Sequence, residues 1–139
     1  MPVKCLPLML CAAMLGSGAA AEDLTIPQQA IVAEMRDTVL AYSVVNRLQD
    51  MCADVIADDA RLSAHRDHVM SLAQDVFASK EAFMKAAGAG EQEKMGEAIR
   101  RFFLDRGVTW EDSADTYCAL ARALQAVKAP LSANFTLRD

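Results

Sequence analysis

The stretch between Pro27 and Gly88 contains neither glycine nor proline, and its apolar side chains recur every three or four residues. This spacing is that of one face of an α-helix, whereas a half-buried strand would alternate every second residue. The repeating apolar positions are Ile31, Met35, Val39, Tyr42, Val45, Leu48, Cys52, Val55, Leu62, Val69, Ala73 and Val76. Pro27 suits the first turn of a helix, because the N–H that it lacks has no partner there. The pattern predicts helix from Pro27 onward, and no clear run of alternating residues indicates a sheet.

A single straight helix of this length would be unusual in a small domain, so at least one break is expected before Gly88. Without glycine or proline, only polar side chains that cap helix ends can mark the break. Ser43 and the pair Asp58-Asp59 are the candidates for that role.

Helix ends are easier to place in the second half of the chain. Ser79 followed by Lys80-Glu81 predicts a helix start, with the serine as N-cap and an acidic side chain in the first turn. The segment Gly88-Ala89-Gly90 predicts an interruption, because glycine is a poor helix former. The next helix is predicted to stop at Gly107, which can adopt the left-handed cap conformation while Val108 folds back onto the last turn.

The final helix is predicted to follow a tight turn. Thr109 and Asp112 can cap that turn, and Asp112 or Ser113 can begin the helix. Its apolar face carries Tyr117, Cys118, Leu120, Ala121, Leu124 and Val127. Pro130 ends it, and residues 131–139 are expected to form a loosely docked tail. Short connections between amphipathic helices predict an all-α fold, a small antiparallel bundle of four or five helices.

The first 21 residues have the pattern of a secretory signal peptide. Lys4 provides a positive charge, residues 5–15 are apolar, and Ala19-Ala20-Ala21 forms a small-residue cleavage site. An apolar stretch of this length is too short to span a bilayer, which takes about 20 residues. We therefore expect cleavage after Ala21, a periplasmic or secreted location, and a single mature domain of residues 22–139.

Two cysteines remain after cleavage, Cys52 and Cys118. An even pair in an oxidising compartment most often forms a disulfide, and this one would join the final helix to an earlier one. No Cys-x-x-Cys motif is present, so neither a thioredoxin-type redox site nor covalently attached haem is expected. The sequence therefore predicts a helical domain held by one structural disulfide.

The mature domain is acidic. Without Lys4 it has 13 basic against 19 acidic residues, which gives a net charge of −6. Such a domain repels the phosphates of nucleic acids and anionic lipids alike. Neither nucleic acid nor membrane insertion after cleavage is therefore expected, and the expected partner is another protein of the envelope.

Several short segments resemble a family of small secreted alphaproteobacterial proteins, catalogued as domain of unknown function 5333. The similar segments are Cys52-Ala53-Asp54, FLDRGV at 103–108, Asp112 and YCAL at 117–120. The likeness covers roughly residues 44–124. It implies an envelope location and supports the disulfide, and it implies no activity.

The only histidines, His65 and His68, lie three residues apart on a predicted helix. In that arrangement they could share a metal ion, provided that Asp58 or Asp59 supplied a third ligand. The simpler interpretation is a solvated helix flank, because Arg66 between them disfavours a cation. No Gly-x-Ser-x-Gly turn and no Glu-x-x-His repeat is present, so the sequence predicts neither a catalytic residue nor a cofactor.

The other conspicuous side chains have structural interpretations. The mature methionines lie one to a helical segment, as core-filling residues do: Met35, Met51, Met70, Met84 and Met95. Trp110 is expected to cover the end of the bundle, and recognition of a partner is the alternative.

Three hypotheses for function follow. The first is a non-enzymatic interaction or accessory module that binds an envelope protein through a helical face. The second is an acid-responsive periplasmic chaperone, because protonation of the many carboxylates would make the net charge positive and loosen the bundle. The third is a bundle that binds a metal or small ligand near His65 and His68.

Overall fold

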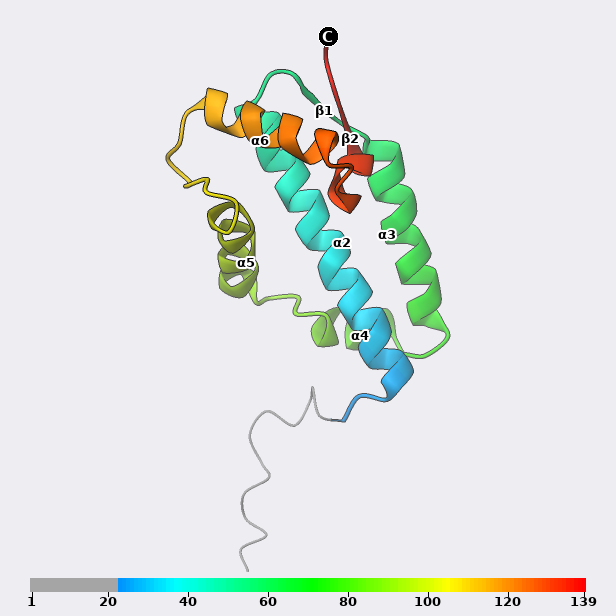
Figure 1. Ribbon diagram of the computed structural model, residues 1–139. Helices are drawn as coiled ribbons and strands as arrows, with labels where there is room; N and C mark the ends of the chain where they lie inside the picture. Colours follow the sequence, from blue (N-terminus) through cyan, green and yellow to red (C-terminus); the bar gives the residue numbers. More distant parts are fainter. Residues whose placement is uncertain (1–22) are drawn as a thin grey trace, which may run out of the picture.

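The structure is a computed structural model that describes residues 23–139, so the predicted signal peptide lies outside the described residues. Within that range the fold is mostly helical, as predicted, with five α-helices (Figure 1). The elements are α2 (Ile26–Met51), β1 (Val55–Ala57), α3 (Asp59–Gln74), α4 (Lys80–Ala86), α5 (Gln92–Leu104), α6 (Ala114–Ala126), the 3₁₀ helix η1 (Pro130–Asn134) and β2 (Phe135–Leu137).

Helix α2 is the centre of the molecule. Helix α3 runs antiparallel beside it, α5 lies on its other side, and α6 crosses its C-terminal end (Figure 1). Helix α2 starts one residue before Pro27, at a capping box in which Thr25 and Gln28 each satisfy a backbone N–H of the other. No described helix is both long and apolar enough to cross a membrane.

Of the two predicted breaks, only the aspartate pair is correct. Helix α2 continues through Ser43, whose hydroxyl donates to the Val39 carbonyl oxygen at 2.8 Å and is thereby satisfied inside the helix. Asp58 is the N-cap of α3, because its carboxylate accepts the Arg61 N–H at 2.9 Å. Cys52 and Asp54 lie in the short connection between the two helices.

The predicted helix ends at Ser79, at residues 88–90 and at Gly107 are confirmed, whereas the final helix, α6, ends at Ala126 and not at Pro130. Ser79 caps α4 by accepting the Ala82 N–H at 3.1 Å, and residues 87–91 separate α4 from α5. Gly107 has a φ of 76°, and the Val108 N–H donates to the Phe103 carbonyl oxygen at 2.9 Å. The Thr109 N–H donates to the Asp112 carboxylate at 2.7 Å, which closes the turn before α6.

Two apolar clusters form the core. The larger one surrounds the C-terminal half of α2 and includes Leu48, Cys52, Phe103, Tyr117 and Phe135. The smaller one surrounds its N-terminal half and is made by Val32, Met35, Val69, Ala73 and Phe83. Helix α2 contributes to both clusters and therefore links the two ends of the fold.

The expectation of a loose tail at 131–139 is wrong, and so is that of a chain without a sheet. Strand β2 pairs antiparallel with β1, with Val55 opposite Leu137 and Ala57 opposite Phe135. Phe135 is only 2% exposed. The Gln125 amide holds the tail by donating to the carbonyl oxygens of Ser132 and Phe135 at 3.0 and 2.8 Å. Three-residue strands are too short to show an alternating pattern in the sequence.

Candidate partner-binding groove

The middle of α2 exposes two large apolar side chains that its periodicity had assigned to the core. Val39 is 38% exposed and Tyr42 is 45% exposed. They lie three residues apart, so they are neighbours on one face of the helix. Scattered exposed apolar residues are ordinary, but a hollow lies on each side of Val39.

The first hollow has three methionines among its lining residues. It has a volume of about 230 Å³ and lies where α2, the connection between α4 and α5, and the first turn of α5 meet. We call it the methionine groove, and its lining residues are Met35, Val39, Met84, residues 87–92 and Met95. Met35 is buried and also belongs to the core, whereas Met84 and Met95 are half-buried.

The glycine turn between α4 and α5 forms the far wall of this groove. Gly88 and Gly90 have φ values of 91° and 94°, which reverse the chain within a few residues. The Ala89 N–H donates to the Met84 carbonyl oxygen at 2.9 Å. A β-carbon at Gly88 would lie 2.9 Å from the end of the exposed Glu91 side chain, which can move aside, so the positive φ rather than a lack of space favours glycine at that position.

The second hollow lies between α2 and α3. It has a volume of about 100 Å³, and its lining residues are Thr38, Val39, Tyr42, Leu62, Ser63 and Arg66. Val39 lines both hollows, so an apolar strip runs from the methionine groove across α2 to Tyr42 and Leu62. Leu72 on α3 is as exposed as Val39, at 40%, but it lines neither hollow.

The methionine groove was not predicted from the sequence. Met35, Met84 and Met95 come from three different helices. Met35 is buried in the smaller core cluster and Met84 packs against it, as core-filling residues do, whereas Met95 does not belong to that cluster. No local sequence signal could have indicated that these three methionines line a common hollow, because their positions relative to one another depend on the conformation of the glycine turn between α4 and α5.

The two histidines lie on the exposed flank of α3, as the simpler interpretation predicted. The Nε2 atom of His65 is 3.9 Å from the Glu34 carboxylate, and both side chains are exposed. Within residues 23–139, no third ligand atom joins His65 and His68. The structure therefore does not bring Asp58 or Asp59 to these histidines as a metal site would need.

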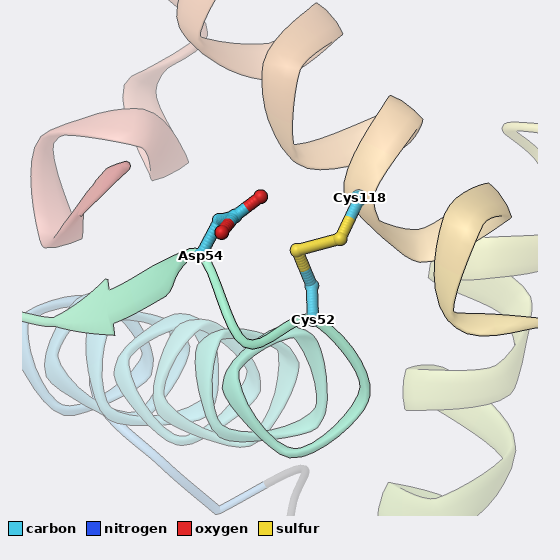
Figure 2. A group of neighbouring side chains, drawn as sticks. All are labelled: Cys52, Asp54 and Cys118. Carbon is cyan, nitrogen blue, oxygen red and sulfur yellow. A yellow bond between two sulfur atoms is a disulfide. The ribbon is translucent and has the colours of Figure 1, made fainter. Parts of the chain in front are cut away.

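The one group of three potential metal ligands among the described residues is Cys52, Asp54 and Cys118, whose ligand atoms lie within 4.8 Å of one another (Figure 2). The two sulfur atoms are bonded to each other, which confirms the predicted disulfide, and the Cα atoms are 5.2 Å apart. Bonded sulfurs offer no thiolate to a metal ion. The disulfide indicates an oxidising compartment outside the cytoplasm.

Trp110 lies at the end of the bundle, as expected. Its indole ring is half-buried and packs edge-on against Phe103, with 6.2 Å between the ring centroids. The Arg47 guanidinium lies over the ring at 3.8 Å from its centroid.

Comparisons with protein-family models, with curated proteins and with solved structures find no match to this chain. The resemblance to the secreted family therefore stays a prediction.

Proposed function

We propose that this protein is a non-enzymatic interaction module of the bacterial envelope, which binds an apolar segment of a partner protein along the exposed face of α2. The observation that supports the proposal is the position of Val39. It is a large apolar side chain open to solvent, between two apolar hollows that a partner's side chains could fill.

The chemistry of the groove suits protein recognition. Methionine side chains are flexible and polarizable, so a surface made of them can adapt to different apolar partners. Tyr42 adds an aromatic ring with a polar tip, and tyrosine is enriched where partners make their strongest contacts. Covering this strip would remove apolar surface from water, at roughly 25 cal/mol per Å².

The proposed compartment is the periplasm. Its support is the disulfide, which needs an oxidising environment, together with the pattern of the first 21 residues. The proposed partner is accordingly another envelope protein. The acidic net charge of the domain favours a protein partner over nucleic acid.

Site-specific photo-crosslinking in the producing cell tests this function. A photoreactive amino acid replaces Val39 in one variant and Leu72 in a control variant, because the two positions are equally exposed. We expect a discrete crosslinked protein from position 39 and none from position 72. The Tyr42→Asp substitution should abolish the crosslink from position 39. Identical crosslinking from both positions, or none from either, contradicts the proposal.

A further inference from the structure

A separate hollow lies between α5 and the turn that precedes α6. It has a volume of about 580 Å³, and it shares only Gln92 with the methionine groove. The side chain of Trp110 lines it on one side, and Gly96 with its neighbours on α5 lines it on the other.

The fold alone does not explain why position 96 is a glycine. It is the only glycine inside a helix among the described residues, in the middle of α5, where glycine lowers helix stability. A β-carbon at this position would meet no atom within 4 Å, so packing does not require a glycine. Because glycine has no side chain, nothing projects from α5 at this position into the hollow that Trp110 also lines. Local departures of this kind occur at functional sites.

Trp110 is held in place before any ligand arrives. The Arg47 guanidinium stacks on the indole ring and donates to the Trp110 carbonyl oxygen at 2.8 Å. The Tyr117 hydroxyl donates to the carbonyl oxygens of Thr109 and Trp110 at 3.0 and 3.2 Å. A fixed aromatic surface binds a ligand without first losing side-chain freedom.

The polar groups around the hollow carry charges of both signs, two negative and one positive. Glu93 and Glu97 offer carboxylate acceptors and Gln92 offers both a donor and an acceptor. Arg100 offers guanidinium donors, and its guanidinium carbon lies 5.5 Å from the centroid of the Trp110 ring, at the edge of the space that a ligand would enter. None of the three charged side chains forms an ion pair within the described part of the chain. An anion would meet Glu93 and Glu97, and a cation would meet Arg100. A neutral ligand rich in hydroxyl groups can use all of them.

We propose that this hollow binds a neutral saccharide, with a sugar ring packed against Trp110 in the space that Gly96 leaves open. A sugar ring combines an apolar C–H face, which suits an aromatic surface, with hydroxyl groups that both donate and accept hydrogen bonds. The Trp110 indole and the polar side chains of α5 supply the matching partners.

The chain contains a single tryptophan, so its fluorescence reports directly on this hollow. The oxidised protein is titrated with maltotriose, cellotriose and di-N-acetylchitobiose. We expect a saturable change in Trp110 emission with at least one of them, at a millimolar Kd. Absence of a response to all three overturns the proposal, as does a saturable response only to citrate or spermidine.

Two substitutions on α5 and one control test the geometry. Gly96→Leu should weaken binding at least tenfold without lowering Tm, because it fills the hollow and removes a glycine from a helix. Arg100→Gln should also weaken binding. Arg101→Gln, on the same helix but outside this hollow, should leave the titration unchanged. Parental affinity in Gly96→Leu overturns the proposal. Tyr42→Asp should not alter the titration, which separates this site from the proposed partner-binding strip.

Discussion

The guanidinium carbon of Arg47 lies 3.8 Å from the centroid of the Trp110 ring, although 63 residues separate the two in the sequence. Arg47 also donates to the Trp110 carbonyl oxygen and lies 3.4 Å from the Tyr117 hydroxyl. Its side chain thus connects α2 with the turn before α6 and with α6 itself. The Nε atom is buried without a partner among the described residues, so the Nη2 atom carries the hydrogen bonding.

Replacement of Arg47 by methionine should lower the free energy of unfolding by about 2 kcal/mol, because it removes a cation–π contact and charged hydrogen bonds while keeping the apolar stem. Urea unfolding followed by far-UV circular dichroism measures the change. Arg101→Met is the control, since that arginine is exposed, and it should stay within about 0.5 kcal/mol of the parent. Equal effects of the two substitutions would show that Arg47 is not a structural link.

Removal of the disulfide should cost far more. In the loop-closure model, a bridge between residues 66 positions apart stabilises the fold by about 4 kcal/mol. The double substitution Cys52→Ala, Cys118→Ala should therefore lower the free energy of unfolding by about that amount. The oxidised parent and the parent with reductant are compared by urea unfolding. A loss below about 1 kcal/mol would mean that the bridge has little structural role.

The Asp54 carboxylate should slow reduction of the disulfide. It lies within 4.8 Å of both sulfur atoms, and Cys52 is fully buried (Figure 2). A thiolate that attacks the bridge approaches this negative charge, at a cost of about 1 kcal/mol in a water-like dielectric. Asp54→Asn should therefore speed reduction by glutathione about fivefold at low salt.

Substitution of Arg122 should have the opposite effect on the rate of reduction, because its guanidinium lies 3.4 Å from the Asp54 carboxylate and partly neutralises it. Arg122→Gln should slow reduction by glutathione. The uncharged reductant tris(hydroxypropyl)phosphine should reduce all three proteins at similar rates, and high salt should shrink the differences. The same rate increase in Asp54→Asn with the phosphine would indicate a change in access to the bridge instead of a charge effect.

The C-terminal strand should be a structural element of the domain. Phe135 is buried in the larger core cluster, so Phe135→Ala should lower the free energy of unfolding by about 3 to 4 kcal/mol. Thr136→Ala, at the neighbouring exposed position, should have little effect. Parental stability in Phe135→Ala would restore the interpretation of residues 131–139 as a loose tail.

The helical parts of this fold could be predicted because their signals are local. Asp58, Ser79 and Gly107 mark helix ends through bonds to residues no more than a turn away. The predicted break at Ser43 is wrong, because the hydroxyl of a serine can form a hydrogen bond inside a helix as well as cap a helix end.

The tail and the binding surfaces depend on contacts that no sequence pattern displays. Strand β2 exists because residues 55–57 offer it a partner far away in the chain. Val39 follows the helical periodicity of a core residue, yet it is 38% exposed, because periodicity shows which face of a helix is apolar but not how much of that face other elements cover. The disulfide was predictable because two of the four cysteines lie in the predicted signal peptide, and the remaining two allow a single pairing.

The pairing of β1 with β2 has a consequence for when this domain can fold. Strand β1 follows the first helix of the described chain, but its partner consists of residues 135–137, near the C-terminus. Until those residues have left the ribosome, β1 has no partner strand and the larger core cluster lacks Phe135. Completion of the larger core cluster is thereby delayed until residues 135–137 have been synthesised, and the elements made earlier stay incompletely packed until then.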